Sequence, residues 1–158
     1  MKRKSKNTKK EVARKGAEYR WRKFYREALE ELRKVLEENG PMLLEDVVEK
    51  TKLSKRMILK ITNLNPEIFV KLFFSTASLT RKIKLSDVFD LPPKPNRRYT
   101  IIYLKNDSRI VDFFASRVRK PIDNGKCRAI TFSLSRILGK FITKKIIDKV
   151  VLETTENN

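Results

Sequence analysis

Positively charged side chains are the groups in this sequence whose number and spacing most clearly suggest chemistry. Residues 50 to 60 carry five of them and no acidic residue: Lys50, Lys52, Lys55, Arg56 and Lys60. Ammonium and guanidinium groups at such spacing bind the phosphate oxygens of nucleic acids. The run therefore predicts contact with a polyanion.

The whole chain shares this bias. Its 158 residues include 38 Lys and Arg against 19 acidic residues, which gives a net charge of +19. This excess goes beyond what solubility requires and points to DNA, RNA or an anionic membrane surface. No stretch approaches eighteen uninterrupted apolar residues, and no apolar segment follows the basic N-terminus. We therefore expect a cytoplasmic, nucleoid-associated protein and no membrane partner.

The charge is concentrated in two parts of the chain. Residues 1 to 26 hold twelve basic and two acidic residues, and residues 81 to 149 hold eighteen basic and six acidic ones. Residues 27 to 80 are nearly neutral, and most of their acids precede position 50. We expect phosphate contacts on both sides of the 50 to 60 run. The residues assigned to these contacts include Arg14, Arg20, Arg22, Arg97 and Arg98.

Groups suited to catalysis or metal binding are few. The sequence has no His and one Cys, Cys127, so it offers no ligand set for structural zinc, no disulfide and no partner for a nucleophilic mechanism. It has no Gly-rich phosphate loop. Carboxylates could hold Mg²⁺ for a nuclease reaction, from Asp87, Asp90, Asp107 or Asp112, although no spacing singles them out. We predict a protein that is not an enzyme and uses no cofactor or metal.

Two short helices joined by a tight turn are expected to position the basic run, within residues 44 to 62. Their apolar positions recur at helical spacing: Leu44, Val47, Val48, Met57, Ile58 and Ile61. Ser54 is suited to cap the second helix. Its outward residues are then Lys55, Arg56, Leu59, Lys60 and Asn63. Such a helix could enter a major groove, but an ordinary helical hairpin that exposes Lys to solvent is the alternative.

The neighbouring elements follow from the same patterns. Residues 1 to 10 are basic with no apolar face, which predicts a disordered arm that binds phosphates or merely solubilises the chain. A long helix is expected from about Glu11 to Glu38, in which Trp21 and Tyr25 are typical of a core, with base stacking as the alternative. Residues 67 to 74 and 79 to 85 have strand patterns.

Three helices followed by a β-hairpin are the element order of a winged helix. Residues 24 to 91 resemble the winged-helix DNA-binding domains common among archaeal and bacterial regulators. The resemblance implies base contacts from Ser54, Lys55, Arg56, Leu59 and Lys60. It also implies phosphate contacts from a wing at 75 to 82, which includes Arg81 and Lys82. One departure is Lys52, which stands where Gly is often found, so the turn must close without the residue that most easily adopts a positive φ.

The C-terminal part begins after a Pro-rich linker at residues 92 to 98, which predicts a domain boundary. A strand at 99 to 104 and three helices are expected beyond it, and the apolar last helix could support a homodimer. Residues 121 to 138 are also similar to an Asp-Gly-Arg-x-Arg segment of the small accessory subunit of archaeal primases. This second resemblance implies phosphate contacts from Lys126 and Arg128.

The sequence thus predicts a mainly α protein with a small β component. Its expected parts are a basic arm (1–10), a long helix with a winged helix (11–91), a linker (92–98), a basic strand and helix region (99–152) and a tail (153–158). We expect it to bind duplex DNA as a transcription regulator or architectural protein. The alternative is an accessory subunit of a nucleic-acid machine such as a primase, or a ribonucleoprotein component that binds RNA or single strands.

Overall fold

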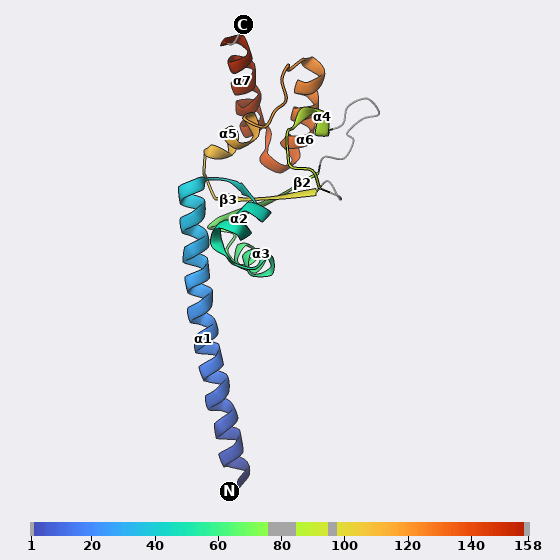
Figure 1. Cartoon of the computed structure of the whole chain (residues 1–158). Coiled ribbons are helices and arrows are strands. Elements are labelled where there is room, and N and C mark those ends of the chain that lie inside the picture. The colour runs from blue at the N-terminus through green and yellow to red at the C-terminus, as the bar shows by residue number, and fades with distance from the viewer. Residues whose placement is uncertain (1, 76–84, 95–97, 157–158) are drawn as a thin grey trace.

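The computed structural model describes residues 2–75, 85–94 and 98–156. As the sequence predicted, the protein is mainly helical with a small sheet (Figure 1). The elements are, in chain order, α1 (Lys2–Asn39), β1 (Met42–Leu43), α2 (Leu44–Thr51), α3 (Lys55–Leu64), β2 (Phe69–Ser75), α4 (Leu85–Val88), β3 (Arg98–Leu104), α5 (Arg109–Ala115), α6 (Asn124–Leu138) and α7 (Lys140–Glu156).

The sheet has three antiparallel strands in the order β1-β3-β2. Strand β3 pairs with β2 over its full length, from Phe69 opposite Leu104 to Ser75 opposite Arg98. The expected partner strand at 79 to 85 lies outside the described residues apart from Leu85, which begins α4. Since β3 follows the Pro-rich linker, the sheet joins residues from both sides of the predicted domain boundary.

The middle of the sheet is buried on both faces, whereas Phe73 in β2 is 66% exposed. Ile101 and Ile102 are neighbours in β3 and both have no exposed surface, because successive side chains of a strand point to opposite faces. Ile102 packs with residues of α1, α2 and α3, whereas Ile101 packs with residues of α4, α5, α6 and α7. Figure 1 shows these two groups of helices on opposite sides of the strands. Strand β3 therefore belongs to both halves of the core.

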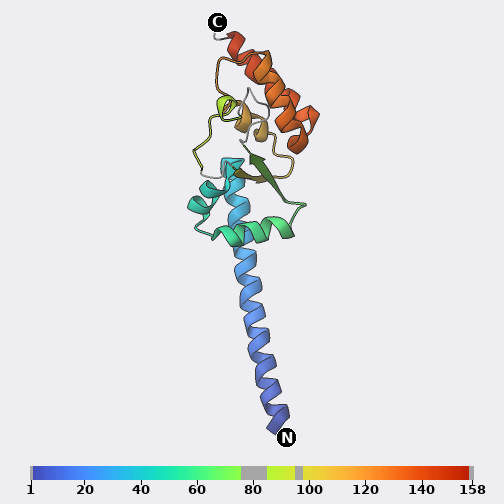
Figure 2. The same ribbon diagram turned by 90° about the vertical axis from the view of Figure 1, so that its right-hand side faces the viewer.

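Helix α1 packs against the body only through its C-terminal half. Ala28, Leu32, Val35 and Leu36 are buried, whereas every residue from 10 to 24 is exposed. We call residues 10–24 the α1 overhang, because the helix runs past α3 and away from the rest of the molecule in both views (Figures 1 and 2).

Helix α1 begins at Lys2, where the sequence predicted a disordered arm. The physical reason is that Lys and Arg are good helix formers and that no Gly or Pro occurs before Gly16. The absence of an apolar face argues against packing, but it does not argue against a helix.

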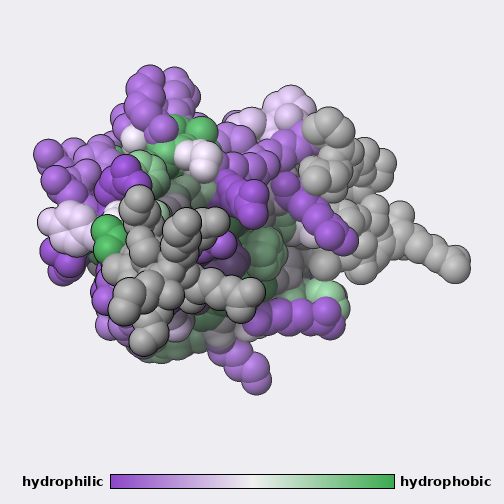
Figure 3. All heavy atoms as spheres, turned by 90° about the horizontal axis from the view of Figure 1, so that it is seen from below, coloured by the Kyte–Doolittle hydropathy of each residue, from purple (hydrophilic) through white to green (hydrophobic). Residues whose placement is uncertain are grey.

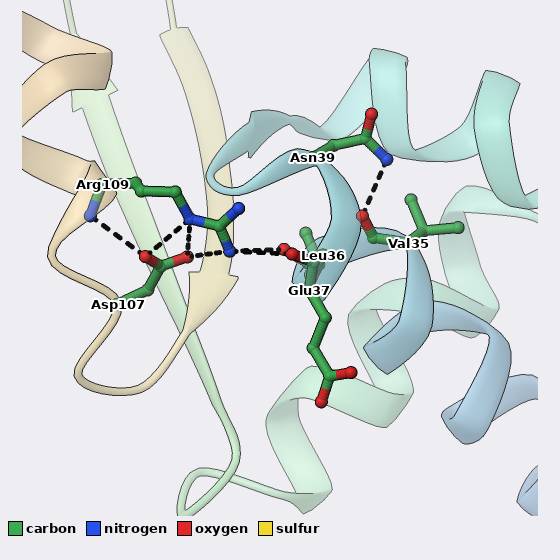
Figure 4. Close-up of polar contacts among 6 residues, drawn as sticks. All are labelled: Val35, Leu36, Glu37, Asn39, Asp107 and Arg109. Carbon is green, nitrogen blue, oxygen red and sulfur yellow. Dashed lines mark hydrogen bonds and ion pairs between the residues drawn. The ribbon is translucent and has the colours of Figure 1, made fainter.

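The C-terminal end of α1 is held by a side chain from α5 (Figure 4). The Arg109 guanidinium donates hydrogen bonds to the carbonyls of Leu36 (3.3 Å) and Glu37 (3.0 Å) and forms an ion pair with Asp107 (2.9 Å). The last turn of α1 contains no basic residue, so Arg109 supplies the positive charge that favours the carbonyl end of a helix. This contact fixes the direction of α1.

Side chains near the starts of α6 and α7 make local hydrogen bonds. Asp123 caps α6 by accepting a hydrogen bond from the Lys126 backbone (2.8 Å). Helix α7 begins at Lys140, and the buried Thr143 hydroxyl donates to the Gly139 carbonyl (2.7 Å) from inside its first turn. Across the described ranges, no helix has both the length and the apolar character that a membrane crossing requires.

Candidate nucleic-acid interface

The turn between α2 and α3 sets the orientation of the basic run. Thr51 donates its hydroxyl to the Val47 carbonyl (2.7 Å) and accepts a hydrogen bond from the Leu53 backbone (3.2 Å). Lys52 adopts the left-handed conformation with φ 62° and ψ 10°, the role usually given to Gly after a helix. Ser54 caps α3 by accepting from the Met57 backbone (3.1 Å), which confirms the predicted cap.

Helix α3 has one buried and one exposed face. Ile58 and Ile61 have no exposed surface and Thr62 is 4% exposed. Four polar residues of this helix are exposed and form what we call the α3 outer face: Lys55, Arg56, Lys60 and Asn63. Leu59, also predicted to face outward, is half-buried. The outward orientation of the four polar residues is therefore confirmed.

The start of α3 is strongly electropositive. Its first turn contains Lys55 and Arg56 and no acidic residue. The backbone N–H groups at a helix start already carry partial positive charge, so a cation at such an exposed site costs about 0.3–1 kcal/mol. An anion bound at this end would contact both the side chains and the helix dipole favourably.

Two other elements extend the α3 outer face. Lys71 of β2 donates a hydrogen bond to the Asn63 side-chain carbonyl. The Lys60 ammonium lies 4.4 Å from the ring centre of Trp21 in α1. Sequence reasoning missed Lys71, although a single Lys in the apolar run of residues 68 to 74 was the available signal. The contact with Asn63 links the end of α3 to the sheet.

The α1 overhang carries the predicted residues Arg14, Arg20 and Arg22, all exposed. Arg14 lies 4.0 Å from Glu18 one helical turn away, a weak surface pair. Viewed from below, along the overhang, the coloured surface is mostly hydrophilic with small hydrophobic areas between (Figure 3). The overhang and the α3 outer face together give a basic surface on the same part of the molecule.

Three of the remaining predicted site residues, Arg81, Lys82 and Arg97, lie outside the described residues. Arg98 is exposed at the start of β3. The Lys126 ammonium donates to the carbonyls of Arg119 (3.4 Å) and Pro121 (2.7 Å), so it holds the segment before α6. Arg128 is exposed on α6, and α6 packs on the other side of the sheet from α3.

Three acidic residues of the C-terminal half each lie next to a cation. Asp107 pairs with Arg109, Asp112 with Lys149, and Asp90 with Arg119 (3.2 Å). In the described part of the chain, no three His, Cys, Asp or Glu side chains lie together as a metal site would require. Burial, and then the nearby Asp123 carboxylate, raise the pKa of the Cys127 thiol and so favour its protonated form.

Comparison with known proteins adds no relative. No family model matches the chain, and no curated protein and no solved structure matches it at a significant level. A function for this protein is therefore inferred from its own residues.

Proposed function

We propose that this protein binds duplex DNA without catalysing a reaction on it, and that α3 enters the major groove. The observation that carries this proposal is the α3 outer face, where Lys55, Arg56 and Lys60 are exposed on a helix that buries Ile58 and Ile61 in the core. A major groove about 12 Å wide admits one α-helix, and cations on its outer side reach both phosphates and base edges.

The arrangement of elements supports a winged helix. Helices α1, α2 and α3 are followed by the antiparallel pair β2 and β3, with the short α4 between the two strands in the chain. Apart from α4, this is the element order of a winged helix. In winged helices the wing lies between these two strands, where this chain has residues 76 to 97, and the described part of that connection contains α4. Lys52 provides the left-handed turn position that Gly often provides in such proteins. These features favour the regulator or architectural role predicted from the sequence.

Competition between nucleic acids tests this proposal. A labelled duplex bound by the full chain is challenged at fixed salt with the same duplex unlabelled, and with unrelated duplex, single-stranded DNA and RNA of equal length. We expect the same duplex to displace the label at concentrations at least tenfold lower than any other competitor, because base contacts typically contribute about 1–3 kcal/mol each. Equal displacement by all four competitors would contradict a sequence-reading role.

The alternative, an accessory subunit of a nucleic-acid machine, is favoured by a separate observation. Phe132, Phe141 and Leu152 on α6 and α7 are each more than half exposed, although aromatic and aliphatic side chains gain from burial. A heteromeric complex that forms with native extract and is abolished in Phe141→Ala would support this alternative. A chain that selects one duplex sequence without any partner would support the regulator.

A further inference from the structure

We propose that the groove between α1 and the end of α3 binds an unstacked nucleotide of a single strand, with the base on Trp21 and the phosphate among three cations. The groove has a volume of about 450 Å³. The inference rests on the proposed nucleic-acid binding, but it concerns a second site and a different form of the ligand. We call this site the α1–α3 groove.

Two aromatic rings form the α1 side of the groove. Trp21 is 44% exposed, and its ring centre lies 6.5 Å from that of Tyr25. The Tyr25 hydroxyl accepts a hydrogen bond of 2.6 Å from the Asn65 side chain, which fixes the Tyr25 ring beside the end of α3. Leu64 is 60% exposed on the α3 side. The groove thus has aromatic rings on its α1 side and an aliphatic side chain on its α3 side, and it is open to solvent.

The charges around these rings select an anion. Arg22, Arg26 and Lys60 line the groove, and no acidic residue does. Within the described part of the chain, none of the ion pairs of 4.0 Å or less involves these three cations. A ligand that matches both features must combine a flat aromatic group with negative charge. A nucleotide has both groups, and single-strand binders use this combination of stacking and cations.

The present position of Lys60 shows how the ligand would enter. Its ammonium covers the Trp21 ring at 4.4 Å, a contact that is weak at an exposed site. Stacking of one base on an aromatic side chain is generally stronger than such a contact. Replacement of the ammonium by a base is therefore favourable, and it frees Lys60 to bind the adjacent phosphate.

A base that is paired and stacked inside a duplex cannot reach the Trp21 ring, because both of its faces are covered by neighbouring bases. The α1–α3 groove therefore distinguishes single strands, unpaired ends and bulges from intact duplex. Lys60 belongs to both the groove and the α3 outer face, so a strand that leaves a duplex bound at α3 has a direct path into the groove.

Trp21 is the only Trp of the chain, so its fluorescence reports on the groove directly. The full chain is titrated with an oligothymidylate of about ten nucleotides and with an abasic oligonucleotide of equal length and charge. We expect strong quenching by the oligothymidylate and weak quenching by the abasic strand. Equal quenching by the two strands, or none by either, would overturn the proposal.

Affinities of labelled strands give the second readout. Trp21→Ala should weaken oligothymidylate binding about 5- to 150-fold, the equivalent of 1–3 kcal/mol. The factor by which the same variant weakens duplex binding should be at least five times smaller. Trp21→Phe should retain much of the single-strand affinity. Phe132→Ala, an exposed aromatic on α6 with Arg136 over its ring, is the matched control and should change neither affinity.

Other results would reassign or reject the site. Equal losses for duplex and single strand in Trp21→Ala would show a general structural effect. Quenching by polyglutamate, or by raising the protein concentration alone, would assign the groove to an acidic protein segment or to a second copy of the chain. If duplex binding depends on Lys55 and Arg56 but no strand quenches Trp21, the groove inference fails and the proposed function stands. If no nucleic acid binds, both fail.

Discussion

Lys52 closes the turn between α2 and α3 in a conformation that residues other than Gly rarely adopt. Its φ of 62° places Cβ close to the following carbonyl, which costs about 1–2 kcal/mol. The backbone N–H of Lys52 still donates to the Val48 carbonyl (3.0 Å), so the helix end is satisfied despite the strain. The turn geometry therefore depends on its neighbours and not on the preference of Lys52.

Lys52→Gly should raise the free energy of unfolding by about 0.5–1.5 kcal/mol, because Gly removes the strain but adds flexibility to the unfolded chain. Urea denaturation measures the change. Lys52→Ala is the control, since Ala removes the charge and keeps the strain. An equal gain in both variants would show that charge, not φ, limits stability here.

Asp107 links stability to pH. Burial raises the pKa of its carboxyl, but hydrogen bonds from the Arg109 side chain and backbone and the Arg109 charge together outweigh burial, so the pKa is lowered. The unfolded carboxyl, with a pKa near 3.9, then holds its proton more tightly than the folded one. The stability from this contact is therefore present above about pH 4 and decreases as pH falls further.

Asp107→Asn should therefore flatten the dependence of stability on pH below about pH 4. Urea midpoints measured in steps from about pH 6 down to about pH 2.5 provide the test. Asp87→Asn, an exposed carboxyl on α4, is the control. An unchanged acid dependence in Asp107→Asn would mean that this carboxyl does not set the proton balance of folding.

At the scale of elements, the contact between α1 and α5 sets where the overhang points. Arg109 is separated by more than seventy residues from the carbonyls it binds, Leu36 and Glu37. Gly40, at φ 78°, lets the chain turn there, and a Cβ on it would lie 3.2 Å from the Arg109 side chain. The end of α1 and the start of α5 are thus packed directly against each other.

Arg109→Met should lower the free energy of unfolding by about 1–2 kcal/mol. The variant keeps roughly the length of the side chain but removes its charged hydrogen-bond donor. Hydrogen bonds from a charged donor contribute about 1.5–3 kcal/mol. The expected loss is smaller because the Arg109 side chain is 43% exposed and water screens its charge. Thermal or urea unfolding measures the loss. Arg128→Met, an exposed Arg on α6, should change stability little, and a similar loss there would contradict the assignment.

Local patterns explain which elements were predictable from the sequence. The Ser54 cap and the two faces of α3 depend on residues within four positions of each other, so spacing alone identified them. The pairing of β2 with β3 and the Arg109 contact depend on residues far apart in sequence. No local pattern encodes such contacts, so sequence reasoning could not distinguish Arg109 from the other basic residues. The Lys60–Trp21 contact of the groove was missed for the same reason.

At the scale of the whole molecule, the two ends of the chain lie at opposite ends of an elongated protein (Figures 1 and 2). The basic overhang is on the α3 side of the sheet, whereas the cations of α6 and α7 are on the other side. The sequence predicted two basic parts, residues 1 to 26 and residues 81 to 149. The overhang of the first part lies on the same side of the sheet as α3, whereas the helices of the second part lie on the other side. A duplex bound at α3 would therefore contact the overhang rather than the cations of α6 and α7.

Deletion of residues 1 to 10 should weaken duplex binding about uniformly across sequences, because this segment holds six Lys or Arg and no acid. The slope of log affinity against log salt should become shallower by about 0.9 for each phosphate that the shortened chain no longer neutralises. Stability should be unchanged, since α1 is buried in the body only from Ala28 onward. A weakening confined to one sequence would contradict a purely electrostatic role for this segment.

The most direct test of the central claim is the discrimination between duplex sequences by Lys55→Ala/Arg56→Ala. A preferred duplex is first selected from a random pool with the unaltered chain, and its affinity is compared with that of a scrambled duplex at fixed salt. Lys144→Ala/Lys145→Ala, two exposed cations on α7, is the control with equal charge loss. We expect the ratio of the two affinities to fall at least tenfold in the α3 variant and to stay unchanged in the control. Equal, sequence-independent losses in both variants would contradict the assignment of α3 as the reading helix.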